Sequence, residues 1–100
     1  MSDIVKQLGP EAPIQVNERG GQQSAIPVRC DLLPPKAILE VAATLAPAAI
    51  KYGEDNWRKI PRKDHLNHAL AHIFAHLAGD DADDHLNHAA CRLLFAMETL

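Results

Sequence analysis

Every histidine of this 100-residue chain falls between Asp64 and Arg92, and this confinement limits the possible folds more than any other feature of the sequence. In a helix, residues three and four positions apart share a face. With that period, the first part of the stretch gives an apolar face made of Leu66, Ala69, Leu70, Ile73, Phe74 and Leu77. Beside it lies a histidine face made of His65, His68, His72 and His76. The pattern predicts a two-faced helix.

The same periodicity resumes after Gly79 and a run of aspartates. The second apolar face consists of Leu86, Ala89, Ala90, Leu93, Leu94 and Met97, and the polar stripe beside it consists of Asp81, Asp84, His85, His88 and Arg92. Two helices joined by so short a connection run antiparallel. Both polar stripes are offset from their apolar faces in the same sense, so we expect them on the same side of a helical hairpin.

The whole chain is predicted to be all-α, with an irregular N-terminal arm over residues 1–30 and a single helical domain over residues 31–100. The arm contains scattered prolines and glycines and shows no sustained period. Its NERGGQQS segment is interpreted either as a mobile linker, which its composition favours, or as a loop that closes over a site.

Local signals predict where the helices of the domain begin and end. Asp31 is expected to cap the first helix, because aspartate is a common capping residue and the prolines that follow fit a first helical turn. Pro47 should end or kink that helix, and Gly53 should stop any further turn. Asp64 is expected to cap the first histidine helix.

Composition excludes several function classes. The net charge of −3 gives no basic surface for nucleic acid, and the longest apolar run, Ile38 to Ile50, is too interrupted to span a membrane. Two cysteines in a chain without a secretory leader indicate reduced thiols in a cytoplasm. Because a chain this short with so few aromatic residues builds only a small core, we expect a homo-oligomer in which partner subunits complete a helical bundle.

The histidine pattern predicts a divalent metal site. Imidazoles at helical spacing on two facing helices supply the ligands that such an ion needs. The predicted ligands are His68, His72, His85, His88 and Asp84. This mixed set suits Mn²⁺, Fe²⁺, Co²⁺, Ni²⁺ or Zn²⁺ better than Mg²⁺. The alternative is a solvated histidine face, and His76 is expected to belong to solvent in either case.

Arg92 stands inside the otherwise metal-like stripe, one turn beyond His88. A guanidinium beside a metal is suited to bidentate contacts with the phosphate oxygens of a substrate. The alternative is a surface ion pair with Asp84 or Glu98. The two interpretations remain equally open from the sequence.

The segment KYGEDNWRKIP, which precedes the first histidine helix, concentrates groups that bind specific ligands. Lys51 and Arg58 are candidates to neutralise phosphate charge. Trp57 is either a core or interface anchor, or a stacking surface for a nucleobase whose edge is bound by Asn56.

In order and spacing, these motifs resemble a known family. The runs are GGQQS, RCDLLPPKAI, KYGEDNWRKIP and DHLNHALAHIFAHLAGDDADDHLNHAACRLLFAM, within Asn17 to Met97. They resemble small phage and bacterial proteins described as dATP/dGTP diphosphohydrolase domains. The layout is also distantly similar to the MazG-like all-α nucleotide pyrophosphatases, whose metal-binding carboxylates on two helices correspond to histidines here.

The resemblance implies metal-dependent hydrolysis of dATP or dGTP to the monophosphate and pyrophosphate, in a bacterial or phage-infected cytoplasm. On this interpretation, Asp84 and Arg92 are catalytic, and Lys51, Asn56, Trp57 and Arg58 bind the deoxypurine nucleotide. Two alternatives stay open because the hairpin has no glutamate before Glu98 to act as a general base. One is a non-catalytic, phage-encoded protein that binds or inhibits a host protein, and the other is a nucleotide sensor.

Overall fold

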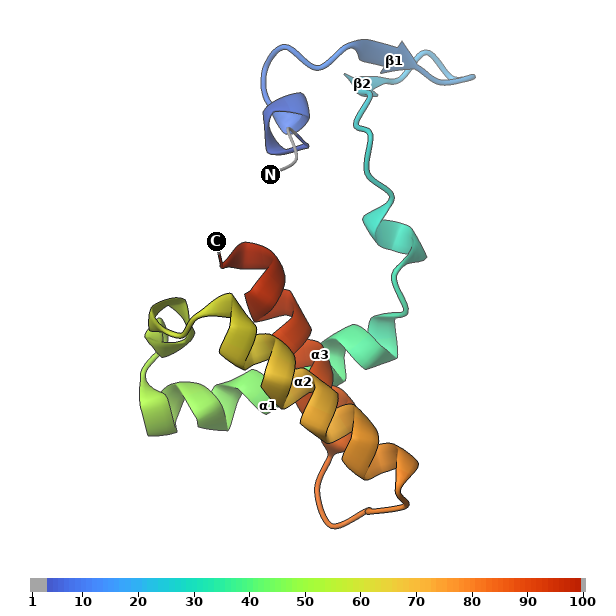
Figure 1. Ribbon diagram of the computed structural model, residues 1–100. Helices are drawn as coiled ribbons and strands as arrows, with labels where there is room; N and C mark the ends of the chain where they lie inside the picture. Colours follow the sequence, from blue (N-terminus) through green and yellow to red (C-terminus); the bar gives the residue numbers. More distant parts are fainter. Residues whose placement is uncertain (1–3, 100) are drawn as a thin grey trace. The chain divides into compact units, whose positions relative to one another are not determined.

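The computed structural model describes residues 4–99, which divide after Leu33 into two compact units. The first contains η1 (Val5–Leu8), β1 (Ile14–Val16), β2 (Gln22–Ser24) and η2 (Cys30–Leu32). The second contains α1 (Pro35–Tyr52), η3 (Asn56–Lys59), α2 (Arg62–Leu77) and α3 (His85–Glu98) (Figure 1). The mostly helical class is confirmed, with one small sheet added. None of the helices described is long and apolar enough to cross a membrane.

Residues 14–24 form an antiparallel β-hairpin within the segment expected to be irregular. Gln15 lies opposite Gln23. In the turn, the Asn17 side-chain oxygen accepts hydrogen bonds from two backbone N–H groups, each at 2.9 Å, and Gly20 adopts a φ of 81°. Asparagine and glycine favour such turns. Strands of three residues are too short to show an alternating pattern in the sequence, so the hairpin was not anticipated.

Pro47 was expected to end or kink the first helix, and helix α1 runs past it, so an end at this proline is wrong. A proline removes a single amide donor, and the hydrogen bonds on either side keep the helix going to Gly53, whose φ of 93° suits glycine. The expected cap at Asp31 is also wrong. The helix begins at Pro35, whereas Asp31 lies in η2 and forms an ion pair with Arg29 at 2.8 Å.

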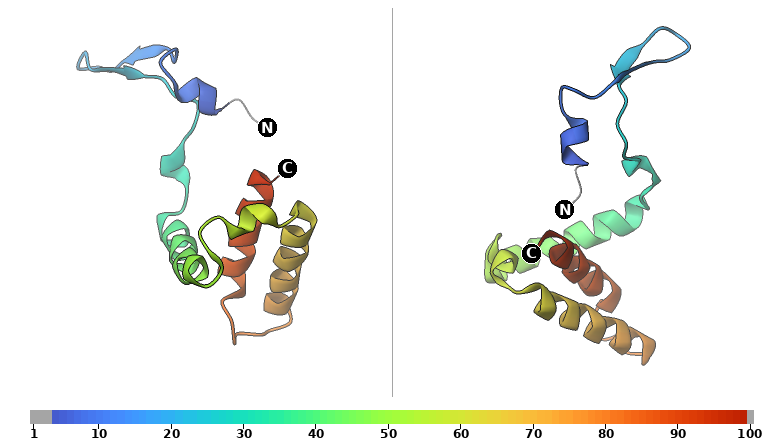
Figure 2. Two further views of the ribbon diagram at one scale, coloured as in Figure 1. Left: turned by 90° about the vertical axis from the view of Figure 1, so that its left-hand side faces the viewer. Right: turned by 45° about the horizontal axis from the view of Figure 1, so that its top comes forward.

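Helices α2 and α3 lie side by side and antiparallel, joined by residues 78–84 (Figure 2). This confirms the predicted helical hairpin, and α1 packs against α3. The cap of α2 is Pro61 rather than Asp64, which lies in the first turn. A carboxylate in that turn still interacts favourably with the helix dipole. The helix ends before Gly79, which has a φ of 92°.

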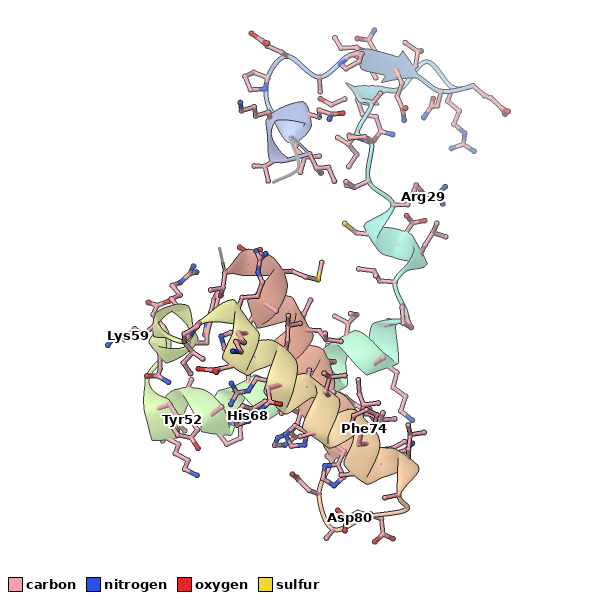
Figure 3. The ribbon with its side chains drawn as sticks, in the orientation of Figure 1. Arg29, Tyr52, Lys59, His68, Phe74 and Asp80 are labelled. Carbon is pink, nitrogen blue, oxygen red and sulfur yellow. The ribbon has the colours of Figure 1, made fainter. Side chains whose placement is uncertain are left out.

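Small side chains make the contact inside the hairpin. Ala69 is 1% exposed, and Ala89 and Ala96 are each 4% exposed, so the two helices meet through methyl groups. Ile73 and Phe95 are half-buried, whereas the other large apolar side chains of the two helices remain 41–72% exposed. This outer apolar surface consists of Leu66, Leu70, Phe74, Leu77, Leu86, Leu93, Leu94 and Met97. Figure 3 labels Phe74 on α2. The apolar stripes predicted from the sequence are therefore only partly covered within one chain.

Candidate functional site

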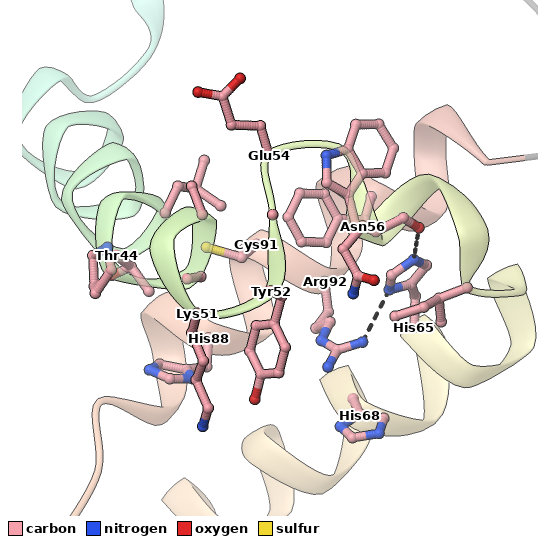
Figure 4. A pocket seen from close by; sticks show the side chains of 18 of the residues that line it. Thr44, Lys51, Tyr52, Glu54, Asn56, His65, His68, His88, Cys91 and Arg92 are labelled. Carbon is pink, nitrogen blue, oxygen red and sulfur yellow. Dashed lines mark hydrogen bonds between the residues drawn. The ribbon is translucent and has the colours of Figure 1, made fainter.

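A pocket of about 730 Å³ lies among α1, η3, α2 and α3. The predicted site residues that line it are Lys51, Asn56, Trp57, His68, His72, His88 and Arg92. Figure 4 shows the side chains of Lys51, Tyr52, His68, His88 and Arg92 gathered around its opening. The two histidine helices thus present polar groups to a shared cavity, and α1 and η3 contribute to the remaining wall.

Trp57 is largely occupied by protein contacts. Its indole stacks on Phe95, with ring centroids 4.8 Å apart and planes 7° from parallel. The Arg58 guanidinium lies 4.3 Å from the centre of the same ring and donates to Asp55 at 3.0 Å. These contacts leave little indole surface for a nucleobase and favour the anchor interpretation. Arg58 lies outside the pocket wall, whereas Tyr52, 59% exposed, offers an aromatic ring to the cavity.

Three side chains form a possible metal-binding group where the pocket meets the hairpin loop. His72 from α2, His88 from α3 and Asp83 from the loop each offer a ligand atom within 4.8 Å of the other two. Two imidazoles and a carboxylate are a common donor set for divalent transition metals. Asp84, selected from the sequence, lies outside this group and accepts a hydrogen bond from Asn87 Nδ2 at 2.6 Å.

A chain of two hydrogen bonds supports the His72 ring: His72 bonds to His85, and His85 bonds to Asp80. His85 Nε2 lies 2.5 Å from Asp80 Oδ2, and its Nδ1 lies 2.9 Å from His72 Nδ1. A carboxylate only accepts, so His85 Nε2 donates, and this bond lowers the pKa of Asp80. In the arrangement where His72 Nδ1 donates to His85 Nδ1, the Nε2 atom of His72 is left free to bind an ion. Metal-ligating histidines are typically held in this manner.

Burial of His72 lowers its pKa, and the neighbouring His88 and His85 lower it further. The lowered pKa favours the neutral imidazole, which is the form that binds a metal. Among the residues described, Arg92 does not form the surface ion pair that was one of its two interpretations from the sequence. Its Nη1 donates to His65 Nδ1 at 3.1 Å, and no ion pair with an acidic side chain is seen within residues 4–99.

We expect the stability of the metal-free protein to fall on acidification. The pKa of His72 is lower in the folded chain than its ordinary value of 6.5, so the unfolded chain binds more protons in the interval between them. The stabilising contribution is complete above 6.5 and is lost as pH falls through the folded pKa. Thermal unfolding at about pH 8 and about pH 5 should show a smaller drop in Tm for His72→Gln than for the unchanged protein. Equal drops would contradict this expectation.

The two cysteines are free thiols. Cys30 is exposed, whereas Cys91 is buried in the pocket wall with its Sγ 3.8 Å from the Val41 carbonyl oxygen. Burial raises the pKa of the Cys91 thiol. A protonated thiol is a poor nucleophile, so Cys91 contributes packing to the wall of the pocket.

Sequence reasoning missed Tyr52, Asp83 and the contacts of His65. Tyr52 lies directly before Gly53, which ends α1, and inside the KYGEDNWRKIP segment. The sequence therefore gave a reason to place Tyr52 near the site. The helical period selected Asp84, one turn before His88, and gave no signal for Asp83, which lies in the irregular loop before α3.

The fold and the pocket define an all-α domain whose cavity is lined by imidazoles and cations. The chain belongs to the family described as dATP/dGTP diphosphohydrolase, N-terminal, which matches residues 17–100. The match confirms the resemblance and covers the whole helical hairpin together with α1. Comparisons with curated proteins and with solved structures give no match.

Proposed function

We propose that this protein hydrolyses dATP or dGTP to the monophosphate and pyrophosphate in a metal-dependent reaction. The observation that carries the proposal is the presence of Lys51 and Arg92 in the same pocket as His72 and His88. Cations beside metal-ligand side chains suit a triphosphate better than a neutral substrate. The family description names the substrate class.

The donor set fits a divalent transition metal. In the proposal, His72, His88 and Asp83 hold the ion, and His85 orients His72. The mixed nitrogen and oxygen donors favour Mn²⁺, Fe²⁺, Co²⁺, Ni²⁺ or Zn²⁺ over Mg²⁺. When bound, such an ion polarises a phosphoryl oxygen and increases the acidity of a nearby water.

Side chains from α1, η3 and α3 would bind and orient the nucleotide. Arg92 would contact phosphate oxygens through its guanidinium, and Lys51 from α1 would neutralise further charge. The purine would stack on Tyr52, which lines the pocket; within residues 4–99 its ring stacks on no other aromatic ring, and Lys51 Nζ lies 5.0 Å from its centroid. Asn56 has both a donor and an acceptor with which to bind the edge of the base.

In this reaction, the oxygen of a water molecule forms a bond to the α-phosphorus, and the bond from that phosphorus to the bridging oxygen of pyrophosphate breaks. A base must take a proton from the water. We assign this role to His68, which lines the pocket and whose ring makes no hydrogen bond to any residue in the range 4–99. Arg92 would stabilise the negative charge that develops on the departing pyrophosphate.

We expect metal-replete protein, purified without a histidine tag, to release pyrophosphate from dATP or dGTP. Arg92→Ala should lower turnover by about a hundredfold with bound metal unchanged, because the guanidinium acts on phosphate. Lys63→Ala is the matched control, since this cation lies on α2 outside the pocket. Chromatography of the nucleotides and a pyrophosphate assay over a panel of deoxynucleotides and ribonucleotides measure both substrate choice and products.

Other outcomes of the same panel would favour other functions. Nucleotide binding without release of pyrophosphate would contradict catalysis and support a nucleotide sensor. A protein that neither binds nor hydrolyses any nucleotide would instead favour a protein-binding or inhibitory role for the hairpin.

A further inference from the structure

His65 is the fully buried polar side chain among the residues described, with 0% exposure, and the reaction proposed above makes no use of it. It lies in the first turn of α2. Its Nε2 is 2.9 Å from the backbone oxygen of Trp57, and its Nδ1 is 3.1 Å from Arg92 Nη1. Phe95 covers the ring, with centroids 5.4 Å apart. One imidazole therefore connects η3, α2 and α3.

The partners of His65 determine where its proton lies. A backbone carbonyl only accepts a hydrogen bond, so Nε2 must carry the hydrogen that it donates to Trp57. A guanidinium only donates, so Nδ1 must be unprotonated to accept from Arg92. Both bonds can exist together only in the neutral imidazole with hydrogen on Nε2. Figure 4 shows the two bonds.

This arrangement leaves Arg92 available to an anion. The guanidinium has five N–H groups, and the bond to His65 is the hydrogen bond recorded for it within residues 4–99. Arg92 also lines the pocket. A neutral acceptor fixes the position of a guanidinium without cancelling its charge, which a carboxylate partner would do. The cation is thus held in place and still able to bind phosphate oxygens.

We propose that His65 is a positioning residue, which holds Arg92 at the pocket wall as a binding group for a phosphate or pyrophosphate anion. The inference rests on the anion-binding part of the proposed function and does not require hydrolysis. His65 does not touch the substrate. It acts through Arg92, and the Trp57 carbonyl selects the neutral tautomer whose Nδ1 can accept from Arg92.

The test measures binding of inorganic pyrophosphate to the full chain by calorimetry. His65→Leu removes both hydrogen bonds and should weaken binding about tenfold. His65→Gln keeps one donor and one acceptor at similar spacing and should recover part of the loss. In an Arg92→Ala background, His65→Leu should cause no further loss, because the residue through which it acts is already absent. Circular dichroism and bound metal check that each variant is folded.

A second readout needs no variant. Nitrogen-15 NMR of the unchanged protein should show His65 as the neutral tautomer with hydrogen on Nε2, and the Arg92 Nη1 signal should shift when pyrophosphate is added. A tautomer with hydrogen on Nδ1 would overturn the inference. So would equal losses from His65→Leu with and without Arg92, since the effect would then not pass through Arg92.

The outcomes separate this inference from the proposed hydrolysis. Coupled loss of pyrophosphate binding, in a protein that releases no pyrophosphate from dATP or dGTP, would leave His65 in its role and contradict the enzyme. Hydrolysis of dATP or dGTP, together with independent effects of His65→Leu and Arg92→Ala on pyrophosphate binding, would support the enzyme and contradict the role given to His65. A folded protein that binds no pyrophosphate would overturn the role given to His65.

Discussion

His72→Ala and His88→Ala are each expected to lower the affinity for a divalent transition metal by more than about a hundredfold, whereas His76→Ala should leave it nearly unchanged. The first two variants each remove a nitrogen from the group that Asp83 completes. His76 lies outside this group and outside the pocket that His72 and His88 line. Titration of tag-free protein with Mn²⁺, Co²⁺, Ni²⁺ and Zn²⁺, followed by metal analysis after dialysis, measures the effect.

A pair of adjacent aspartates provides a sharper control. Asp83→Asn should weaken metal binding strongly, while Asp84→Asn should have little effect, because only Asp83 approaches the two histidines. His85→Ala should fall between them, with a loss of about tenfold to a hundredfold, since it supports His72. Equal losses at 72, 76 and 88, or a larger loss at 84 than at 83, would contradict this arrangement.

Phe74→Glu is expected to dissociate the protein into monomers. We propose that a second copy of the chain covers the outer apolar surface, in which Phe74 is 62% exposed. Large exposed apolar patches are rare on monomeric proteins, and a charge placed in an interface is costly to bury. Light scattering coupled to gel filtration measures the mass of the wild type and the variant.

The control for this experiment is Ile50→Glu. Ile50 is 90% exposed on α1 and lies outside the hairpin, so the same change of charge there should leave the assembly intact. Circular dichroism should show equal helix content in both variants. An unchanged protein that remains monomeric at micromolar concentration would contradict the proposed oligomer.

The hairpin was predictable because its signal is periodic and long. Each histidine helix repeats its apolar and polar positions over several turns, and those repeats specify the element and its faces. The gathering of His68, His72, His88 and Arg92 at one pocket follows from the same geometry. The family resemblance, which the match over residues 17–100 confirms, used these same motifs.

The remaining features depend on contacts between distant residues or on irregular backbone. Asp83 and Asp84 are equivalent by composition, and only the path of the hairpin loop decides which one approaches the histidines. The continuation of α1 through Pro47 overrides the local preference of proline. For Trp57, the sequence left two roles open, and its stacking on Phe95 depends on the packing of η3 against α3.

The buried alanines of the hairpin, Ala69 on α2 and Ala89 on α3, have no reactive group. They nevertheless influence how closely the two helices that carry His72 and His88 approach each other. Ala69 is 1% exposed and Ala89 is 4% exposed, so both methyl groups are covered by protein atoms. Any larger residue there must push α2 away from α3, because a packed contact does not absorb an additional methylene without displacement. The distance between the His72 and His88 imidazoles therefore depends on keeping alanine at positions 69 and 89. We therefore expect Ala69 and Ala89 to tolerate substitution poorly, although neither is part of the proposed metal-binding group.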